Sequence, residues 1–130
     1  TGPASPAAAI PVSAVKFEKT GLPRGPQAYR RYLAEALQTM GISDPQAVRN
    51  WTNGFMTALP RESGFNPGAQ TIPSTFAANH QPGTSTNIFD PVANLCASMN
   101  YLMRRYHVSR DGSNLSSVGQ FNANHAAQGY

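Results

Sequence analysis

The sequence predicts an all-α protein. Apolar side chains recur at steps of three and four residues in three stretches, roughly 26–40, 45–62 and 91–106, which is the spacing of one helix face. Two of these stretches open with Asp-Pro, at Asp44-Pro45 and Asp90-Pro91, so that a capping side chain precedes proline at the first helical position. We find no convincing alternating pattern of a half-buried strand and no internal repeat. We therefore expect a small helical domain.

The first helix is expected to begin at Pro26, after a cluster of glycines and prolines, and to end before Gly41, since glycine suits the position that follows a helix. The second helix should begin at Pro45. Its buried face is expected to carry Val48, Trp51, Phe55, Met56 and Leu59.

A short third helix is expected from about Pro73, and residues 80–87 are expected to form a loop. The fourth helix should begin at Pro91, and Arg104 and Arg105 near its end suit the helix dipole. Its buried face is expected to carry Val92, Leu95, Cys96, Met99, Leu102, Met103 and Tyr106.

Composition divides the chain into three parts. Residues 1–23 form an Ala/Pro-rich arm or linker that cannot bury enough apolar surface to fold alone. Residues 24–107 form the helical domain, and residues 108–130 form a tail rich in Gly, Ser and Asn. A core of this size is marginal, so contacts with a partner or a larger parent chain are expected to support it.

Several classes of function are disfavoured. The net charge of +4 comes mainly from scattered arginines with no dense basic run, so nucleic acid is not expected as the primary ligand. No apolar run approaches the ~20 residues of a membrane span. The single cysteine, Cys96, is expected to fill the core. His80, His107 and His125 lack metal-ligand spacing, so neither a metal nor another cofactor is expected.

A census of the six carboxylates leaves one of them without a structural role. Asp44 and Asp90 are expected to cap helices, and Asp111 is expected in a turn. Glu18 lies at the charged end of the arm, and Glu35 lies on a polar helix face. The remaining carboxylate is Glu62.

Glu62 lies seven residues after Phe55 and so continues the apolar face of the second helix to its end. Burial and the negative end of the helix dipole both disfavour the anion, which predicts a raised pKa and a carboxyl able to donate a proton near neutral pH. The alternative is a partly exposed glutamate at a fraying helix end.

Three sequence blocks resemble the lytic transglycosylases of the soluble-lytic and goose-type lysozyme class. Residues 62–67 read Glu-Ser-Gly-Phe-Asn-Pro and are similar to the family's Glu-Ser signature. Residues 68–76 are similar to its Gly-Leu-Met-Gln block, and residues 87–95, continuing to Tyr101-Leu102, to its Asn-Ile block. The second and third blocks are most similar in sequence to domains of tape-measure proteins of actinobacterial phages and of secreted wall enzymes.

This resemblance implies a lysozyme-like helical fold that cleaves the β-1,4 bond between N-acetylmuramic acid and N-acetylglucosamine, leaving 1,6-anhydromuramic ends. Glu62 would be the single catalytic acid and base, whereas most glycosidases use two carboxylates. The implied substrate-binding residues are Ser63, Gln70, Thr75, Asn87 and Tyr101. Ser63 could instead end its helix, and Tyr101 could be a core aromatic.

The chain also departs from the family. The loop that usually separates the first two blocks is absent at Pro67-Gly68, Ala69 replaces methionine, and residues 120–123 only poorly match an Ala-Tyr-Asn-Ala-Gly block. Two hypotheses therefore stand. One is a muralytic enzyme acting at the bacterial wall, in a virion tail or secreted, with peptidoglycan strands and other phage tail proteins as partners. The other is a structural tail segment whose lysozyme-like domain is inactive or only binds glycan.

Overall fold

The computed structural model describes residues 8–18, 21, 23, 25–62 and 73–115, and for residues 26 and 57–62 the backbone alone. The regular elements of these ranges are helical. They are the 3-10 turn η1 (Val12–Ala14) and the helices α1 (Pro26–Thr39), α2 (Pro45–Glu62), α3 (Pro73–Ala78) and α4 (Pro91–Arg105). The prediction of an all-α protein is thereby confirmed.

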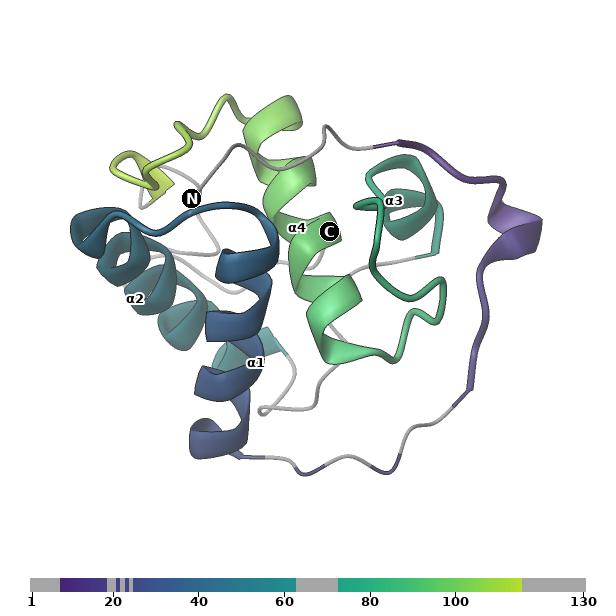
Figure 1. The fold of residues 1–130 in the computed structure, drawn as a ribbon, viewed down its shortest axis with the longest axis horizontal. Helices are drawn as coiled ribbons and strands as arrows, with labels where there is room; N and C mark the ends of the chain where they lie inside the picture. Colours follow the sequence, from purple (N-terminus) through teal and green to yellow (C-terminus); the bar gives the residue numbers. More distant parts are fainter. Residues whose placement is uncertain (1–7, 19–20, 22, 24, 63–72, 116–130) are drawn as a thin grey trace.

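Helices α1 and α4 pack against each other at the centre of the molecule (Figure 1). Helix α2 lies on the outer side of α1, and α3 lies beside α4 on the opposite side. The segment 8–18, drawn in purple, runs along the edge of the molecule beyond α3. Helix α4 therefore packs against α1 on one side and against α3 on the other.

The helix ends follow the expected chemistry. A carboxylate oxygen of Asp44 accepts a hydrogen bond from the amide of Ala47 at 3.0 Å, and one of Asp90 accepts from the amide of Ala93 at 2.8 Å. Each bond satisfies an amide that the first turn of a helix leaves unpaired. Gly41 follows α1 with φ of 74°, a left-handed angle that glycine adopts without steric cost. The predicted starts of α2 and α4 and the end of α1 are confirmed.

The main hydrophobic cluster joins α1, α2 and α4. The predicted stripes supply it, because residues three or four apart share one face of a helix. Val48, Met56, Val92 and Met103 are only partly buried at its margin. Its fully buried members include Leu33, Leu37, Trp51, Phe55, Cys96, Met99 and Leu102.

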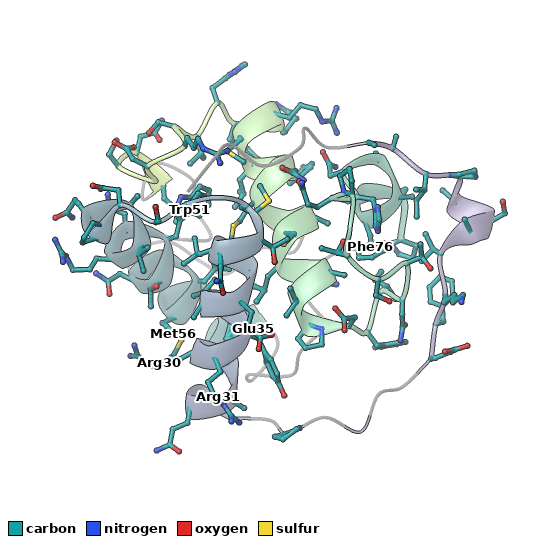
Figure 2. The ribbon with its side chains drawn as sticks, viewed as in Figure 1. Arg30, Arg31, Glu35, Trp51, Met56 and Phe76 are labelled. Atoms are coloured by element: carbon teal, nitrogen blue, oxygen red, sulfur yellow. The ribbon has the colours of Figure 1, made fainter. Side chains whose placement is uncertain are left out.

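A second cluster lies on the other side of α4. Ala93 and Ala97 of α4 meet Phe76 and Ala77 of α3 there, and Ile88 comes from the loop that joins the two helices. Figure 2 shows Phe76 on the α3 side of α4 and Trp51 on the α2 side. The two clusters use different faces of one helix, with small residues where α3 approaches.

The division of the chain at residue 24 does not describe the packing of segment 8–18. Val15 is 7% exposed and belongs to the second cluster, against which Ile10 also packs. The backbone of Lys16 forms a parallel bridge beside Asn87, donating to the carbonyl of Thr86 and accepting from the amide of Ile88. Residues 8–18 do not have to fold alone, because α3 and α4 offer them an apolar surface.

Residues 108–115 likewise differ from the predicted tail. Val108 and Leu115 are buried in the main cluster, and the indole of Trp51 donates to the carbonyl of Arg110 at 2.8 Å. Tyr106, which was expected on the buried face of α4, is 40% exposed because it lies just past the helix end. The segment after α4 therefore completes the core, whereas Tyr106 does not.

Candidate functional site

Glu62 is the last described residue of α2, which spans Pro45–Glu62. The inward stripe of that helix consists of Ala47, Trp51 and Phe55, which are 3%, 0% and 0% exposed. Glu62 follows Phe55 by two helical turns, so its position on the helix continues this stripe. The side chain of Glu62, and Ser63 and Gln70 in full, lie outside the described residues.

The other described carboxylates have positions that fit structural roles. Asp44 and Asp90 cap helices, and Glu35 is exposed on α1 (Figure 2). A carboxylate oxygen of Asp111 accepts from the amide of Ser113 and from the hydroxyl of Ser109, and these bonds, the first most of all, lower the pKa of Asp111. The structural roles predicted for Asp44, Asp90 and Asp111 are confirmed.

Tyr101 is partly buried on α4 and packs against the main cluster. Its ring meets that of Tyr106 edge to face, with centroids 5.9 Å apart. Burial and, next, the hydroxyl of Tyr106 raise the pKa of Tyr101. A tyrosine phenol is neutral around pH 7 in any case, and it can donate one hydrogen bond and accept others.

Asn87 is buried and takes part in the loop between α3 and α4. Its Oδ1 accepts from the amides of Glu18 and Phe89, each at 3.1 Å, and its Nδ2 donates to the carbonyl of Glu18 at 2.7 Å. The family resemblance assigns Asn87 to substrate binding, but in this structure its carboxamide holds the backbone of Glu18.

Thr75 is half-buried in α3. Its carbonyl accepts from the backbone amide of Asn79 at 3.1 Å and from the side-chain amide of the same residue at 2.8 Å. These bonds close the end of α3. The hydrogen bonds and ring contacts given above connect Thr75 to Asn79, Asn87 to Glu18 and Phe89, and Tyr101 to Tyr106.

A buried polar cluster between α3 and α4 was not anticipated from the sequence. The Nδ2 of Asn100 donates to the carbonyl of Asn79 and to the side-chain oxygen of Gln81, both at 3.0 Å, while the guanidinium of Arg104 donates to Asn79 Oδ1. Buried amides need such partners. The available signal was Asn100 itself, an amide in a helix whose other polar residues before the final arginines are Asn94, Ser98 and Tyr101.

Two adjoining hollows of about 310 and 210 Å³ lie where α1 passes into α2. Gly41, Ile42 and Ser43 line both of them, and Arg110 and Asp111 border the larger one. Because α2 is 18 residues long, its two ends are roughly 27 Å apart. These hollows are therefore remote from Glu62 and do not form part of the predicted site.

In the described part of the chain, no group of three or more His, Cys, Asp or Glu side chains could hold a metal ion. None of the helices described there is long and apolar enough to cross a membrane. Comparison of the chain with protein-family models, with curated proteins and with solved structures found no match.

Proposed function

We propose that this protein is a lytic transglycosylase of peptidoglycan in which Glu62 is both the acid and the base. The observation that carries the proposal is the position of Glu62, at the end of α2 and on the helical stripe of Trp51 and Phe55. A carboxyl at the end of an apolar stripe and beside the negative pole of a helix is favoured in its neutral form. That form is the one a glycosidic oxygen requires.

The proposed reaction needs one carboxyl. The acid proton of Glu62 passes to the oxygen of the bond between muramic acid and glucosamine as that bond breaks. The carboxylate then removes the proton from the C6 hydroxyl of the same muramic residue, and that oxygen bonds to C1 to close a 1,6-anhydro ring. The carboxyl is thereby regenerated and no water is consumed. The capping roles of Asp44 and Asp90 support a mechanism without a second acid.

The other implied site residues enter the proposal with distinct roles. Gln70 and Ser63 are assigned to hydrogen bonds with sugar amides and with Glu62, on the resemblance of residues 62–76 alone. Tyr101 is assigned to a hydrogen bond with a substrate acetamido group, on the resemblance and on its position in α4 alone. Thr75 remains a proposed contributor to the wall of the site.

A second candidate function is a phage tail segment that binds glycan without cleaving it. The observation that favours it is the direct junction at Pro67-Gly68, where the family usually has a loop between its first two sequence blocks. Both candidates place the protein at the bacterial cell wall, in a virion tail or as a secreted protein, and both take peptidoglycan strands as the ligand.

Digestion of purified peptidoglycan distinguishes the two candidates. We expect the wild-type chain to release anhydromuropeptides, detected by mass spectrometry, and Glu62→Gln to reduce the rate at least about a thousandfold, since general acid–base catalysis contributes roughly 10²–10⁴ at each step. Glu35→Gln is the matched control, because Glu35 is an exposed carboxylate on α1. Reducing ends would indicate a hydrolase instead, and binding without products would favour the glycan-binding candidate.

A further inference from the structure

The carboxamide of Asn87 presents an acceptor and a donor side by side. Its orientation is fixed from within the loop, because Oδ1 also accepts from the amide of Phe89 at 3.1 Å. The two other described bonds of the carboxamide both go to one residue, Glu18, whose N–H donates to Oδ1 and whose carbonyl accepts from Nδ2. Segment 8–18 thus occupies the carboxamide of Asn87, whose orientation is already fixed. Any ligand that presents an N–H group and an oxygen side by side is complementary to this carboxamide.

An N-acetylated sugar offers such a pair. The N–H of the acetamido group at C2 and the oxygen at C3 lie on neighbouring ring carbons and both project outward. The N–H can donate to a carboxamide oxygen while the C3 oxygen accepts from its NH₂ group. This holds for glucosamine, where the oxygen belongs to a hydroxyl, and for muramic acid, where it belongs to an ether.

Val15 is the buried anchor of the segment, whereas the side chain of Phe17 is 56% exposed and that of Glu18 is exposed as well. The described bonds of Glu18 to the loop are the two that its backbone makes with Asn87. Release of residues 17 and 18 therefore breaks the two bonds to Asn87 and leaves the buried contacts of Val15 intact. A ligand need not displace the whole segment.

We propose that Asn87 is a recognition group for N-acetylated sugars and that Glu18 covers it as a built-in competitor. The proposal rests on the glycan specificity of the proposed function, but not on cleavage. Binding of glycan and closure by Glu18 exclude each other. The apparent affinity is therefore reduced by the fraction of molecules in which Glu18 is bound.

The test uses the full chain and tetra-N-acetyl-chitotetraose, with binding measured by isothermal titration calorimetry. Glu18→Pro removes the N–H donor and should tighten binding about three- to tenfold, the equivalent of one net hydrogen bond. Glu18→Ala is the control: it keeps both backbone groups and should bind as the wild type does. Asn87→Asp lacks the NH₂ donor and should bind at least about fivefold more weakly.

Hydrogen exchange on the wild-type chain gives a second readout that needs no variant. If the sugar displaces Glu18, a saturating concentration should accelerate exchange of the Glu18 amide and leave that of Lys16 unchanged. Unaltered exchange at Glu18, or equal affinities of Glu18→Pro and Glu18→Ala, would overturn the proposal. Missing anhydromuropeptides alongside these binding effects would overturn only the transglycosylase activity, so the two failures can be told apart.

Discussion

Gly112 shows at the scale of one residue how the segment after α4 is fitted to α2. Its φ is +70°, which side chains other than glycine rarely adopt. A Cβ atom added there would lie 3.2 Å from the indole of Trp51 and 3.2 Å from Cβ of Asn50. The backbone of the loop therefore lies directly against the buried ring of Trp51. The hydrogen bond from the Trp51 indole to the carbonyl of Arg110 forms next to this contact.

We expect Gly112→Ala to lower the free energy of unfolding by about 2–4 kcal/mol, since a left-handed alanine costs ~1 kcal/mol and overpacking a core adds ~1–3. Chemical denaturation measures the change. Gly83→Ala is the control, because Gly83 has φ of +88° but no atom within 4 Å of an added Cβ. The control should cost about 1 kcal/mol. Equal losses of stability in both variants would show that the Trp51 indole can move aside without lowering the free energy of unfolding.

Cys96 carries a pH dependence that can be isolated. Burial, with a smaller effect of the Asp90 carboxylate, raises the pKa of its thiol from 9.0 to about 12. Between these values the unfolded chain loses the thiol proton and the folded chain keeps it. The associated stability is therefore complete below pH 9 and is lost as the pH rises towards 12.

We expect the wild type to lose stability with rising pH more steeply than Cys96→Ala in this interval, by up to about 1.4 kcal/mol per pH unit. Urea denaturation of both proteins at pH 8, 9.5 and 10.5 gives the difference, in which the titration of tyrosines and lysines cancels. Parallel curves would mean that the thiol ionises inside the fold.

At the scale of the element, α4 serves two cores at once. Leu95, Cys96, Met99 and Leu102 face the main cluster, while Ala93 and Ala97 face α3 and segment 8–18. Its start is fixed by Asp90, whose side chain accepts from the amide of Ala93, and its N1 residue is proline. A change at this cap therefore acts on the N-terminal end of α4, directly after the loop that carries Asn87.

Replacement of Asp90 by alanine should destabilise the protein by about 1 kcal/mol, within the range of 0.5–2 observed for lost helix caps. Asp90→Asn should retain most of the stability, because asparagine caps as well as aspartate does. Thermal denaturation at pH 7 compares the three proteins. A loss in Asp90→Asn as large as in Asp90→Ala would assign the effect to charge, and so to the dipole of α4, in place of the hydrogen bond.

At the scale of the whole molecule, local signals predicted the helices and missed what packs on them. The caps at Asp44 and Asp90 and the stripes through Trp51 and Met99 are short-range patterns, so the sequence located α1, α2, α3 and α4. Val15 lies in a stretch dominated by Ala and Pro, and Leu115 in one rich in Gly, Ser and Asn, and their burial depends on surfaces that the helices create. Composition averaged over such a stretch does not reveal one well-placed apolar residue.

The candidate site was predictable to a similar extent. The end of α2 at Glu62 followed from the helical period and the residues after it. The engagement of Asn87 by Glu18 could not be predicted, because the two are 69 residues apart and the bonds use backbone groups that every residue possesses. A side chain's identity tells what it can bind, and its position in the fold decides what it does bind.

Segment 8–18 should unfold together with the helices as one cooperative unit. Val15→Ala removes two methyl groups from the second cluster and should lower the free energy of unfolding by about 1.5 kcal/mol, at ~0.8 kcal/mol for each buried carbon. Val12→Ala is the matched control within the same segment: Val12 is 53% exposed, so its loss should change stability by less than about 0.5 kcal/mol. Urea denaturation followed both by tryptophan fluorescence at Trp51 and by circular dichroism should give one midpoint for each variant. If Val15→Ala proves as mild as Val12→Ala, segment 8–18 adds little to the core, and its release to expose Asn87 would cost less than the burial of Val15 implies.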